Sequence, residues 1–396
     1  MSADEFRQFA DKLEAGDETP APEPRIFSRV AIIGATPEGQ LLSCLCLAEG
    51  AEVTLYSPYG SELDAIRAGG GITLRGTGPV GTYHVDRSSG PSIRLTGDLD
   101  AATAGSDLII LAGPVLRQRA AAYALGRVLT VDQTIAVVPG RSFGAIETAW
   151  TFRAGGCTVD ITIIEAQNLC YRIRRDGSVL WLTRSVPGAV ASLPGRREAA
   201  IRGFLRFIHD AAPVANIVES SFADASSAVE LPALLLGGPA APSAAAEIPA
   251  GGVALAERAT FRSLLGEHHL RLVSAMCAER RQVAARWGIH ELPDDADWLD
   301  IHAGALAGDH ARHIPSAVEA DILARCAVVG SLMPLCSAAE LAGVDTPATH
   351  AVSGIALAAL GGGLAATGRS IQSIGITANR IEDARRAIDT IAREGF

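Results

Sequence analysis

Lysine is almost missing from this chain: Lys12 is the only one among 396 residues. A mechanism in which a lysine amine forms a Schiff base is therefore not expected. Any carboxylate of a bound substrate has to be held by arginine, by main-chain N–H groups or by neutral donors. The lack of lysine narrows the possible chemistry before any motif is considered.

Metal-binding patterns are missing as well. The seven cysteines form no Cys-x-x-Cys pair, and Cys44 and Cys46 fall inside one predicted helix. We interpret the cysteines as small buried apolar side chains in a reducing compartment. His268 and His269 are adjacent and so face different sides of a helix, and no histidine pair has i,i+4 spacing. We expect no metal site.

The sequence also lacks an excess of positive charge and long apolar runs. Its formal net charge is −10, and it has no basic stripe with interleaved aromatic residues, which argues against nucleic acid as a partner. Apolar residues make up 48%, but the excess is alanine and glycine, and no uninterrupted apolar run reaches the length of a bilayer. No signal peptide is visible, so we expect a cytoplasmic protein with no membrane contact.

The most informative segment that is present is RVAIIGATPEG, residues 29–39. A short apolar strand meets a glycine-bearing turn and a predicted helix, and a second strand over 52–56 follows at βαβ spacing. Such a turn lays main-chain N–H groups and a helix N-terminus against a pyrophosphate. Thr36 stands where the fingerprint has its second glycine, and its Cβ obstructs the approach of a phosphate. The cofactor-binding residues predicted in this turn are Gly34, Thr36, Pro37, Glu38 and Gly39.

The end of the second strand bears on the choice of coenzyme. An acidic residue there would hold the ribose hydroxyls of NAD, but the strand ends Tyr56-Ser57-Pro58, with no acid until Glu62. Ser57 can donate a hydrogen bond to a 2′-phosphate. The sequence therefore favours NADP(H), with NAD(H) as the alternative.

Further buried parallel strands are predicted over 106–114, 132–140 and 158–165. In an open parallel sheet, ligands lie beyond the carboxyl ends of the strands. Pro114, Pro139 and Gly140 are therefore predicted to contact the cofactor, and Glu165 and Asn168 to face the substrate. For each proline or glycine the alternative is a plain loop residue, and for Glu165 and Asn168 it is a cap of the local turn.

The second half of the chain is dominated by helical periodicity, with amphipathic stretches over 197–210, 254–287, 318–343 and 348–363. We predict a loose N-terminal extension (1–27), a Rossmann-like domain with a doubly wound parallel sheet (28–194), and an α-helical domain (195–396). Residues 237–252 are predicted to be a mobile insertion. The small residues of the last stretch also allow a homodimer.

Several segments together resemble the opine dehydrogenase family, from about residue 29 to the end of the chain. The segments that carry this resemblance are 70–76 (GGITLRG), 96–102 (TGDLDAA), 107–110 (DLII), 137–140 (VVPG), 165–171 (EAQNLCY), 278–280 (AER), 297–299 (DWL), 341–347 (LAGVDTP) and 368–375 (GRSIQSIG). The resemblance implies an NAD(P)H-dependent enzyme that condenses an amine or amino acid with a 2-oxo acid and reduces the imine. It implies a cleft between a nucleotide-binding domain and a helical one.

The chain departs from this family at its proton-handling group, which the family resemblance makes a histidine. Glu230 stands in its place, Asp224 stands near the usual asparagine, and an acidic pair of the family falls on Cys326 and Ala327. Glu230 is the predicted acid/base if an apolar setting raises its pKa. The alternative is a surface or helix-N-terminal carboxylate stabilised only by the helix dipole.

Two more residues match family positions and are predicted substrate contacts. Arg174 follows the family's tyrosine and could hold a carboxylate in a bidentate grip, or be a solvated strand residue. Asp297 precedes Trp298 in the Asp-Trp-Leu motif, where packing of the indole is the alternative.

The first functional hypothesis is an opine dehydrogenase-like oxidoreductase of a specialised biosynthetic pathway, with an unusual substrate because its site is altered. The second is an enzyme that kept the fold and performs non-redox condensation, cyclisation or transfer in the same cleft. The third is a non-catalytic binding protein. The sequence names neither the substrate nor its stereochemistry.

Overall fold

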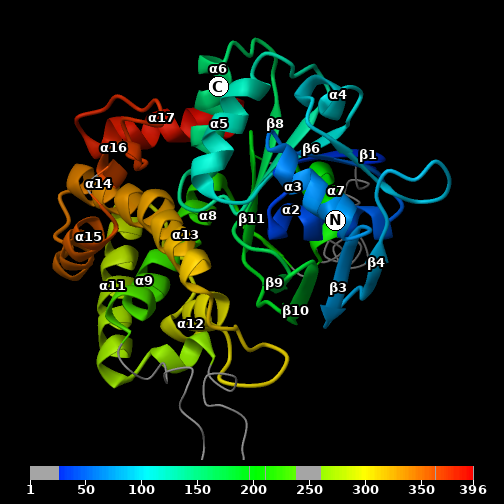
Figure 1. Cartoon of the computed structure of the whole chain (residues 1–396). Helices are drawn as coiled ribbons and strands as arrows, with labels where there is room; N and C mark the ends of the chain where they lie inside the picture. The colour runs from blue at the N-terminus through cyan, green and yellow to red at the C-terminus, as the bar shows by residue number, and fades with distance from the viewer. Residues whose placement is uncertain (1–25, 196, 210, 238–259, 362, 396) are drawn as a thin grey trace, which may run out of the picture.

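A computed structural model of the chain describes residues 26–195, 197–209, 211–237, 260–361 and 363–395. The predicted N-terminal extension lies outside these residues except for Ile26 and Phe27, and the predicted mobile insertion lies outside them except for Gly237. Figure 1 shows a sheet-containing half beside a helical half, with the final helix returning to the sheet. This confirms the predicted fold class.

The larger sheet has eight strands in the order β12-β11-β8-β7-β6-β1-β2-β5. β1 lies between β2 and β6, so the chain reverses its direction of winding there and leaves a crevice at the carboxyl ends of these strands. Only β11 runs antiparallel to its neighbour β8. The strands are β1 (Arg29–Ile33), β2 (Glu52–Tyr56), β5 (Ile93–Thr96), β6 (Leu108–Ala112), β7 (Thr134–Val138), β8 (Thr162–Ala166), β11 (Ala189–Leu193) and β12 (Ala212–Pro213).

A second sheet, which the sequence analysis did not anticipate, has four strands in the order β4-β3-β10-β9. It consists of β3 (Ile72–Gly76), β4 (Gly81–Tyr83), β9 (Tyr171–Asp176) and β10 (Val179–Arg184). Its apolar residues pack in one core with α2 (Pro37–Ala48), α3 (Gly60–Ala68) and α7 (Glu198–Ile208). These elements cover one face of the larger sheet.

The opposite face is covered by α5 (Val115–Leu125), α6 (Gly144–Ala154), α8 (Ile217–Ala223) and α17 (Ile381–Glu394), while α4 (Leu99–Thr103) follows β5. Helix α17 contributes Ala384 and Ile388 to the core that contains Ile146 and Leu193. The C-terminal helix therefore packs on the sheet, in a core that also includes Ala284 and Leu335 of the helical half, and β12 extends the sheet beyond residue 195. The proposed division at residue 195 stays a prediction.

The helical half has its own core. Its elements are α9 (Ser226–Leu231), η1 (Pro232–Leu236), η2 (Phe261–Leu264), α11 (Glu267–Arg286), α12 (Asp295–Ala303), α13 (Ala317–Ala327), η3 (Val328–Leu332), α14 (Met333–Ala342), α15 (Pro347–Leu360) and α16 (Gly363–Thr367). Residues of α9, α11, α12, α13 and α15 pack around the fully buried Trp298. Among the described residues one continuous helix, 317–342, is long and apolar enough to cross a membrane, and 67% of its apolar window is buried inside the protein.

Candidate active site

The turn between β1 and α2 has the backbone geometry of a dinucleotide site. Gly34 has a φ of +117°, which side-chain-bearing residues rarely adopt. A Cβ on Gly39 would lie 1.8 Å from the carbonyl oxygen of Gly34. Glycine is therefore required where helix and strand approach each other. Pro37 opens the helix, where its missing N–H costs nothing.

Thr36 is the N-cap of α2. Its Oγ1 accepts a hydrogen bond from the Gly39 main-chain N–H at 3.4 Å, and its side chain lies against Gly113 after β6. The main-chain N–H groups of the turn suit a dinucleotide phosphate, and the Thr36 side chain lies beside them and narrows the space for it. Glu38 follows in the first helical turn, where its charge suits the helix dipole but opposes a second anion.

The end of β2 carries an ion pair. Ser57 is buried, and its hydroxyl donates to Glu62 Oε2 at 2.7 Å. Glu62 Oε1 accepts from Arg117 at 2.7 Å, and the Arg117 guanidinium lies 5.0 Å from the centre of the Tyr59 ring. The Ser57 hydroxyl, which was predicted to bind a 2′-phosphate, thus donates its hydrogen bond to the Glu62 carboxylate. The strand β2 itself ends without an acidic residue, but helix α3 places Glu62 beside its carboxyl end.

Pro114, Pro139 and Gly140 follow β6 and β7, the strands beside β1, so they lie at the same edge of the sheet as the dinucleotide turn. Pro139 accepts a hydrogen bond from Gln118 through its carbonyl. A Cβ on Gly140 would lie 2.1 Å from Glu165 Cγ. Gly140 therefore has a packing role, whereas contact of these residues with a cofactor stays a prediction.

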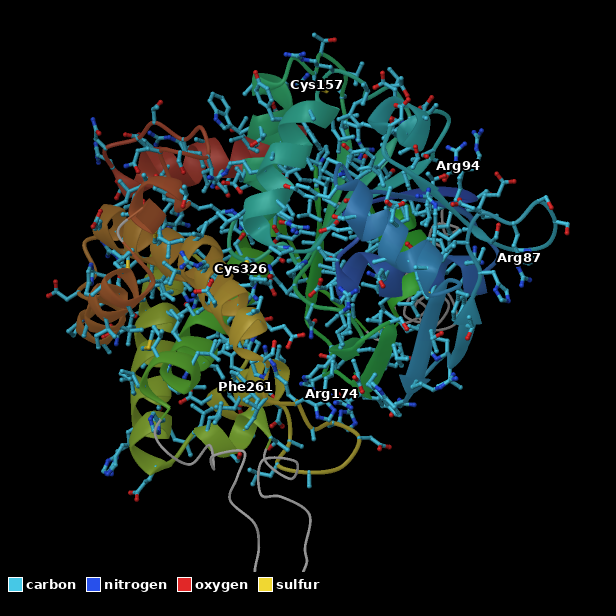
Figure 2. The ribbon with its side chains drawn as sticks, in the orientation of Figure 1. Arg87, Arg94, Cys157, Arg174, Phe261 and Cys326 are labelled. Carbon is cyan, nitrogen blue, oxygen red and sulfur yellow. The ribbon has the colours of Figure 1, made fainter. Side chains whose placement is uncertain are left out.

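The helical half packs directly over this edge. A Cβ on Gly330 of η3 would lie 3.1 Å from Val115 Cγ2 and from Arg141 Cβ. Cys326, near the end of α13, is buried (Figure 2). Burial raises the pKa of the Cys326 thiol, against the opposing influence of Arg141 and the Val115 N–H. The residue that the sequence resemblance aligned with an acid of the family is thus a buried thiol.

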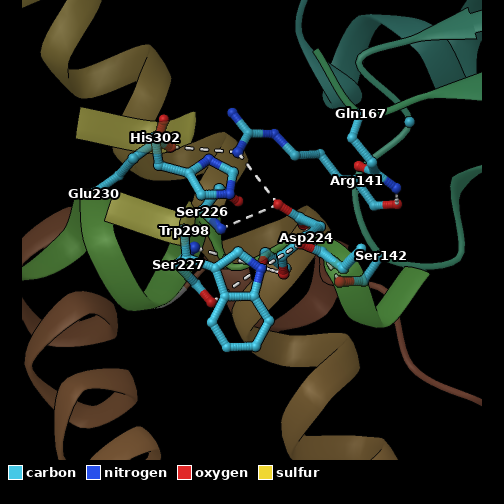
Figure 3. A network of polar contacts seen from close by, with 12 residues as sticks. Arg141, Ser142, Gln167, Asp224, Ser226, Ser227, Glu230, Trp298 and His302 are labelled. Atoms are coloured by element: carbon cyan, nitrogen blue, oxygen red, sulfur yellow. Dashed lines mark hydrogen bonds and ion pairs between the residues drawn. The ribbon is translucent and has the colours of Figure 1, made fainter. Parts of the chain in front are cut away.

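A buried polar network joins the two halves (Figure 3). Arg141 follows β7, and its Nη1 lies 3.3 Å from Glu230 Oε2 and 3.8 Å from Asp224 Oδ1. Arg312 donates to Glu230 Oε1 at 2.9 Å and also to the carbonyl of His302. Both oxygens of Glu230 are therefore paired with arginine.

Neighbouring opposite charges shift the pKa values of Arg141 and Asp224 in this network. Burial alone would lower the pKa of Arg141, but Glu230 and Asp224 raise it above its usual value. Burial would raise the pKa of Asp224, but Arg141 and Arg280 hold it below its usual value. Burial lowers the pKa of His302 to about 4, so its imidazole is neutral near neutral pH.

Glu230 is neither a surface residue nor a helix-N-terminal one. It lies in the last turn of α9 and is 3% exposed. The alternative of a surface carboxylate stabilised only by the helix dipole is therefore wrong. Its role as an acid/base stays a prediction.

Glu165 lies beneath the network and is fully buried. It accepts hydrogen bonds from the Ala145 N–H (2.7 Å), Ser220 Oγ (2.8 Å) and Gln167 Nε2 (3.0 Å). Burial raises its pKa to about 7, against these donors. Asn168 instead donates to Ser185 and to the Val186 carbonyl, so its amide braces a loop.

Arg174 and Asp297 lie outside the network. Arg174, labelled in Figure 2, is on β9. Its guanidinium lies 5.8 Å from the centre of the Trp181 ring. Asp297 completes the capping box of α12 with Asp294. Trp298 is fully buried and donates through Nε1 to the Ala223 carbonyl at 2.8 Å. The structure thus gives Asp297 and Trp298 structural contacts, and substrate contact by Arg174 or Asp297 stays a prediction.

Four residues of this site were not predicted as functional residues from the sequence: Arg141, Ser142, His302 and Arg312. A signal for the first two was present: Gly140-Arg-Ser-Phe-Gly144 follows a buried strand and opens α6, with positive φ at Arg141 and Phe143. Ser142 Oγ lies 3.3 Å from Asp224 Oδ2. A carboxylate partner does not make a serine nucleophile, which needs an adjacent base such as imidazole.

Arg369 ties the C-terminal segment to the turn after β7. Its guanidinium donates to the carbonyls of Gly140 (2.8 Å) and Ser142 (3.0 Å) and to Glu147 (2.6 Å). Burial would raise the pKa of Glu147, but Arg369 and Arg119 hold it below its usual value. The turn that carries Arg141 is therefore fixed from both halves of the chain. Within the described ranges no group of three or more His, Cys, Asp or Glu side chains is arranged to hold a metal.

Comparisons with known proteins show what the chain is similar to. No protein-family model matches the chain. An opine dehydrogenase of Arthrobacter sp. (strain 1C) is 23% identical over 209 residues, which are 52% of this chain and only 56% of that protein. Octopine dehydrogenase with NADH and L-arginine matches with a TM-score of 0.63 at 15% identity, over 90% of this chain and 97% of that one.

Two further solved structures extend the comparison. Yersinopine dehydrogenase with NADP+ matches with a TM-score of 0.58 at 13% identity, over 93% of this chain and 99% of that one. D-Mandelate dehydrogenase with NADH and anilino(oxo)acetate matches with a TM-score of 0.58 at 15% identity, over 85% and 99%. The chain has the fold of the opine dehydrogenases, and the resemblance to that family drawn from its sequence is confirmed.

Proposed function

We propose that the chain is an NAD(P)H-dependent oxidoreductase of the opine dehydrogenase type, which reduces the imine formed from an amine or amino acid and a 2-oxo acid. One observation carries the proposal. The glycine turn after β1 and the polar network after β7 lie at the same edge of the sheet, beneath the helical half. In doubly wound sheets this edge holds the coenzyme.

The coenzyme would be held by the main-chain N–H groups of the Gly34–Gly39 turn and by the residues at the end of β2. When bound, the reduced nicotinamide supplies a hydride. Arg117 supports NADP(H), the coenzyme predicted from the sequence, because an arginine there can pair with a 2′-phosphate. Glu62 supports NAD(H), because a carboxylate there can accept from ribose hydroxyls.

The substrate carboxylate would be held by the arginines of the network. Arg141, Arg280 and Arg312 face two carboxylates, Asp224 and Glu230. Such a buried excess of positive charge favours an anionic ligand. Glu230 remains our candidate for handling protons at the oxo oxygen and the amine, and Arg141 and Arg312 fix its orientation.

The test is a fluorescence titration of the full chain with NADH and, separately, NADPH, followed by a screen of amine and 2-oxo acid pairs for coenzyme oxidation. Saturable binding and turnover of one pair support the proposal. Loss of turnover in Glu230→Gln with coenzyme affinity unchanged would assign Glu230 to the chemistry. A variant that turns over normally removes it from the mechanism.

A second function, non-redox chemistry in the same cleft, is favoured by one observation: Thr36 and Glu38 crowd the helix N-terminus that receives the pyrophosphate. If neither coenzyme binds, this non-redox function is favoured over the redox function. The cytoplasmic location, the biosynthetic role and a homodimer also remain proposals. Gel filtration tests the last of them.

A further inference from the structure

A groove of about 460 Å³ opens between the two halves, beyond the β8 side of the larger sheet. Its walls are the turn after β8, the start of β11, α8, the loop between α11 and α12, and the end of α12. Gln167, His302, Ala189 and Ala223 are its most deeply buried lining residues. The more accessible lining includes Glu219 and Glu291. A volume of this size suits a small organic ligand.

The lining of this groove is acidic. Two carboxylates, Glu219 and Glu291, line it, and no arginine or lysine does. Glu219 Oε2 accepts from the Ala215 N–H at 3.1 Å. Burial and then the charge of Glu291 raise the pKa of Glu219. The groove therefore repels a carboxylate and attracts a cation.

Two buried polar atoms of the groove-lining residues lack a partner among the described residues. They are His302 Nε2 and Gln167 Oε1, on side chains that are each 7% exposed. Gln167 Oε1 only accepts hydrogen bonds, and a neutral imidazole keeps one accepting nitrogen. Native structures rarely leave buried polar atoms unpaired. Both residues thus suit a ligand that brings N–H donors.

The groove is joined to the network of the proposed active site. Gln167 Nε2 donates to the Arg141 carbonyl at 3.0 Å, and the His302 carbonyl accepts from Arg312. Figure 3 shows Gln167 and His302 on either side of the Arg141 side chain. A ligand in the groove therefore ends next to the arginines that would hold the substrate carboxylate.

We propose that this groove binds the amine-bearing substrate through a cationic group, with Glu219 and Glu291 as counter-charges and Gln167 and His302 as hydrogen-bonding partners. This inference rests on the proposed function and names its amine as a basic one, such as a diamine or an amino acid with a positively charged side chain. The groove then binds the cationic group of the amine-bearing substrate, and the arginine network binds the substrate carboxylate.

The experiment is a calorimetric titration of the full chain with putrescine and, separately, with succinate, two probes of equal carbon number and opposite charge. We expect saturable binding of putrescine, whereas any binding of succinate takes place at the arginine network and should be unchanged by substitutions in the groove. Glu219→Gln should weaken putrescine binding about tenfold, the typical effect of losing a hydrogen bond to a charged group. Glu291→Gln, at an exposed position, gives a second variant that does not disturb folding.

Glu340→Gln is the matched control, because Glu340 is an exposed carboxylate on α14, away from the groove lining. The proposal is overturned if putrescine does not bind, if the groove variants weaken succinate binding as much as putrescine binding, or if Glu340→Gln loses as much affinity for putrescine as the groove variants. The last result would reveal non-specific attraction to a chain of net charge −10. A coenzyme titration on the same sample separates the two ideas: coenzyme binding without amine binding removes only the groove, and the reverse removes only the redox function.

Discussion

Arg141 and Glu230 are 89 positions apart in the chain, yet Arg141 Nη1 lies 3.3 Å from Glu230 Oε2 in the interior. The contact joins the turn after β7 to the last turn of α9. Arg312 pairs with the second oxygen of Glu230. This carboxylate therefore links the sheet to two separate segments of the helical half, whatever part it takes in chemistry.

Replacing Glu230 tests that link. Glu230→Gln removes the carboxylate that pairs with Arg312 and leaves Arg141 with Asp224 alone. Removing one partner of a buried ion pair costs about 3–5 kcal/mol. We expect a clear drop in the urea midpoint of unfolding. Glu340→Gln, on an exposed helix surface, should leave the midpoint unchanged. Equal midpoints for both variants would mean that the ion pairs contribute nothing in solution.

The β1–α2 turn could be predicted from sequence because its signals are local. Strand, glycine, proline at the helix start and a closing glycine stand within eleven residues, and each constrains the backbone by itself. The buried strands were also predictable from their apolar runs. The helical half followed from periodicity and from the family resemblance.

The network could not be predicted in the same way. Glu230 pairs with residues 89 and 82 positions away, and no local pattern reports such a contact. Asp297 and Arg174 matched family motifs. In the structure Asp297 caps helix α12, and Arg174 stacks on the Trp181 ring. The position of Ser57 at the strand end was predicted correctly. Its hydrogen bond to Glu62 could not be predicted, because it depends on where α3 begins.

Gly39 should tolerate no side chain. In Gly39→Ala the new Cβ would lie 1.8 Å from the Gly34 carbonyl oxygen, so strand and helix must move apart. We expect a loss of about 3 kcal/mol or more in the free energy of unfolding, measured by urea denaturation. Gly354→Ala in α15 is the control, because open space surrounds it, and alanine should stabilise that helix by about 0.5–1 kcal/mol. Similar effects of the two variants would disprove the close approach.

Thr36 should limit the affinity for a dinucleotide. Thr36→Gly removes the side chain that caps α2 and lies against Gly113, at a capping cost of only a few tenths of a kcal/mol. We expect NADH or NADPH to bind on the order of tenfold more tightly in the fluorescence titration. Thr36→Ser keeps the hydroxyl and should stay near the wild type. If Thr36→Gly binds more weakly, the hydroxyl is itself a phosphate ligand.

Glu62 should set the choice of coenzyme. It holds Arg117 at 2.7 Å, and Glu62→Gln would release that guanidinium for a 2′-phosphate. We expect the ratio of NADPH to NADH affinity to rise by about tenfold, since a charge-assisted hydrogen bond is gained on one coenzyme only. The double variant with Arg117→Gln should lose this gain. An unchanged ratio in Glu62→Gln would place the adenosine ribose elsewhere.

Two buried groups should give the stability of this protein opposite dependences on pH. The pKa of His302 is lowered from 6.5 to about 4, so the unfolded chain binds more protons and stability is lost as pH falls through this range. The pKa of Glu165 is raised from 4.5 to about 7, so the folded chain binds more protons and stability is lost as pH rises. Between about pH 5 and pH 7 each contribution amounts to about 2 kcal/mol, and the two offset each other.

Single variants should separate these contributions. In His302→Gln only the Glu165 contribution remains, so the free energy of unfolding should fall by about 2 kcal/mol from about pH 5 to about pH 7, relative to the wild type. In Glu165→Gln the relative change should have the opposite sign. Urea denaturation at both pH values measures it, and comparison with the wild type cancels the other titrating groups. If His302→Gln has the same pH dependence as the wild type, His302 is not buried as a neutral imidazole, and the groove loses one of its hydrogen-bonding partners.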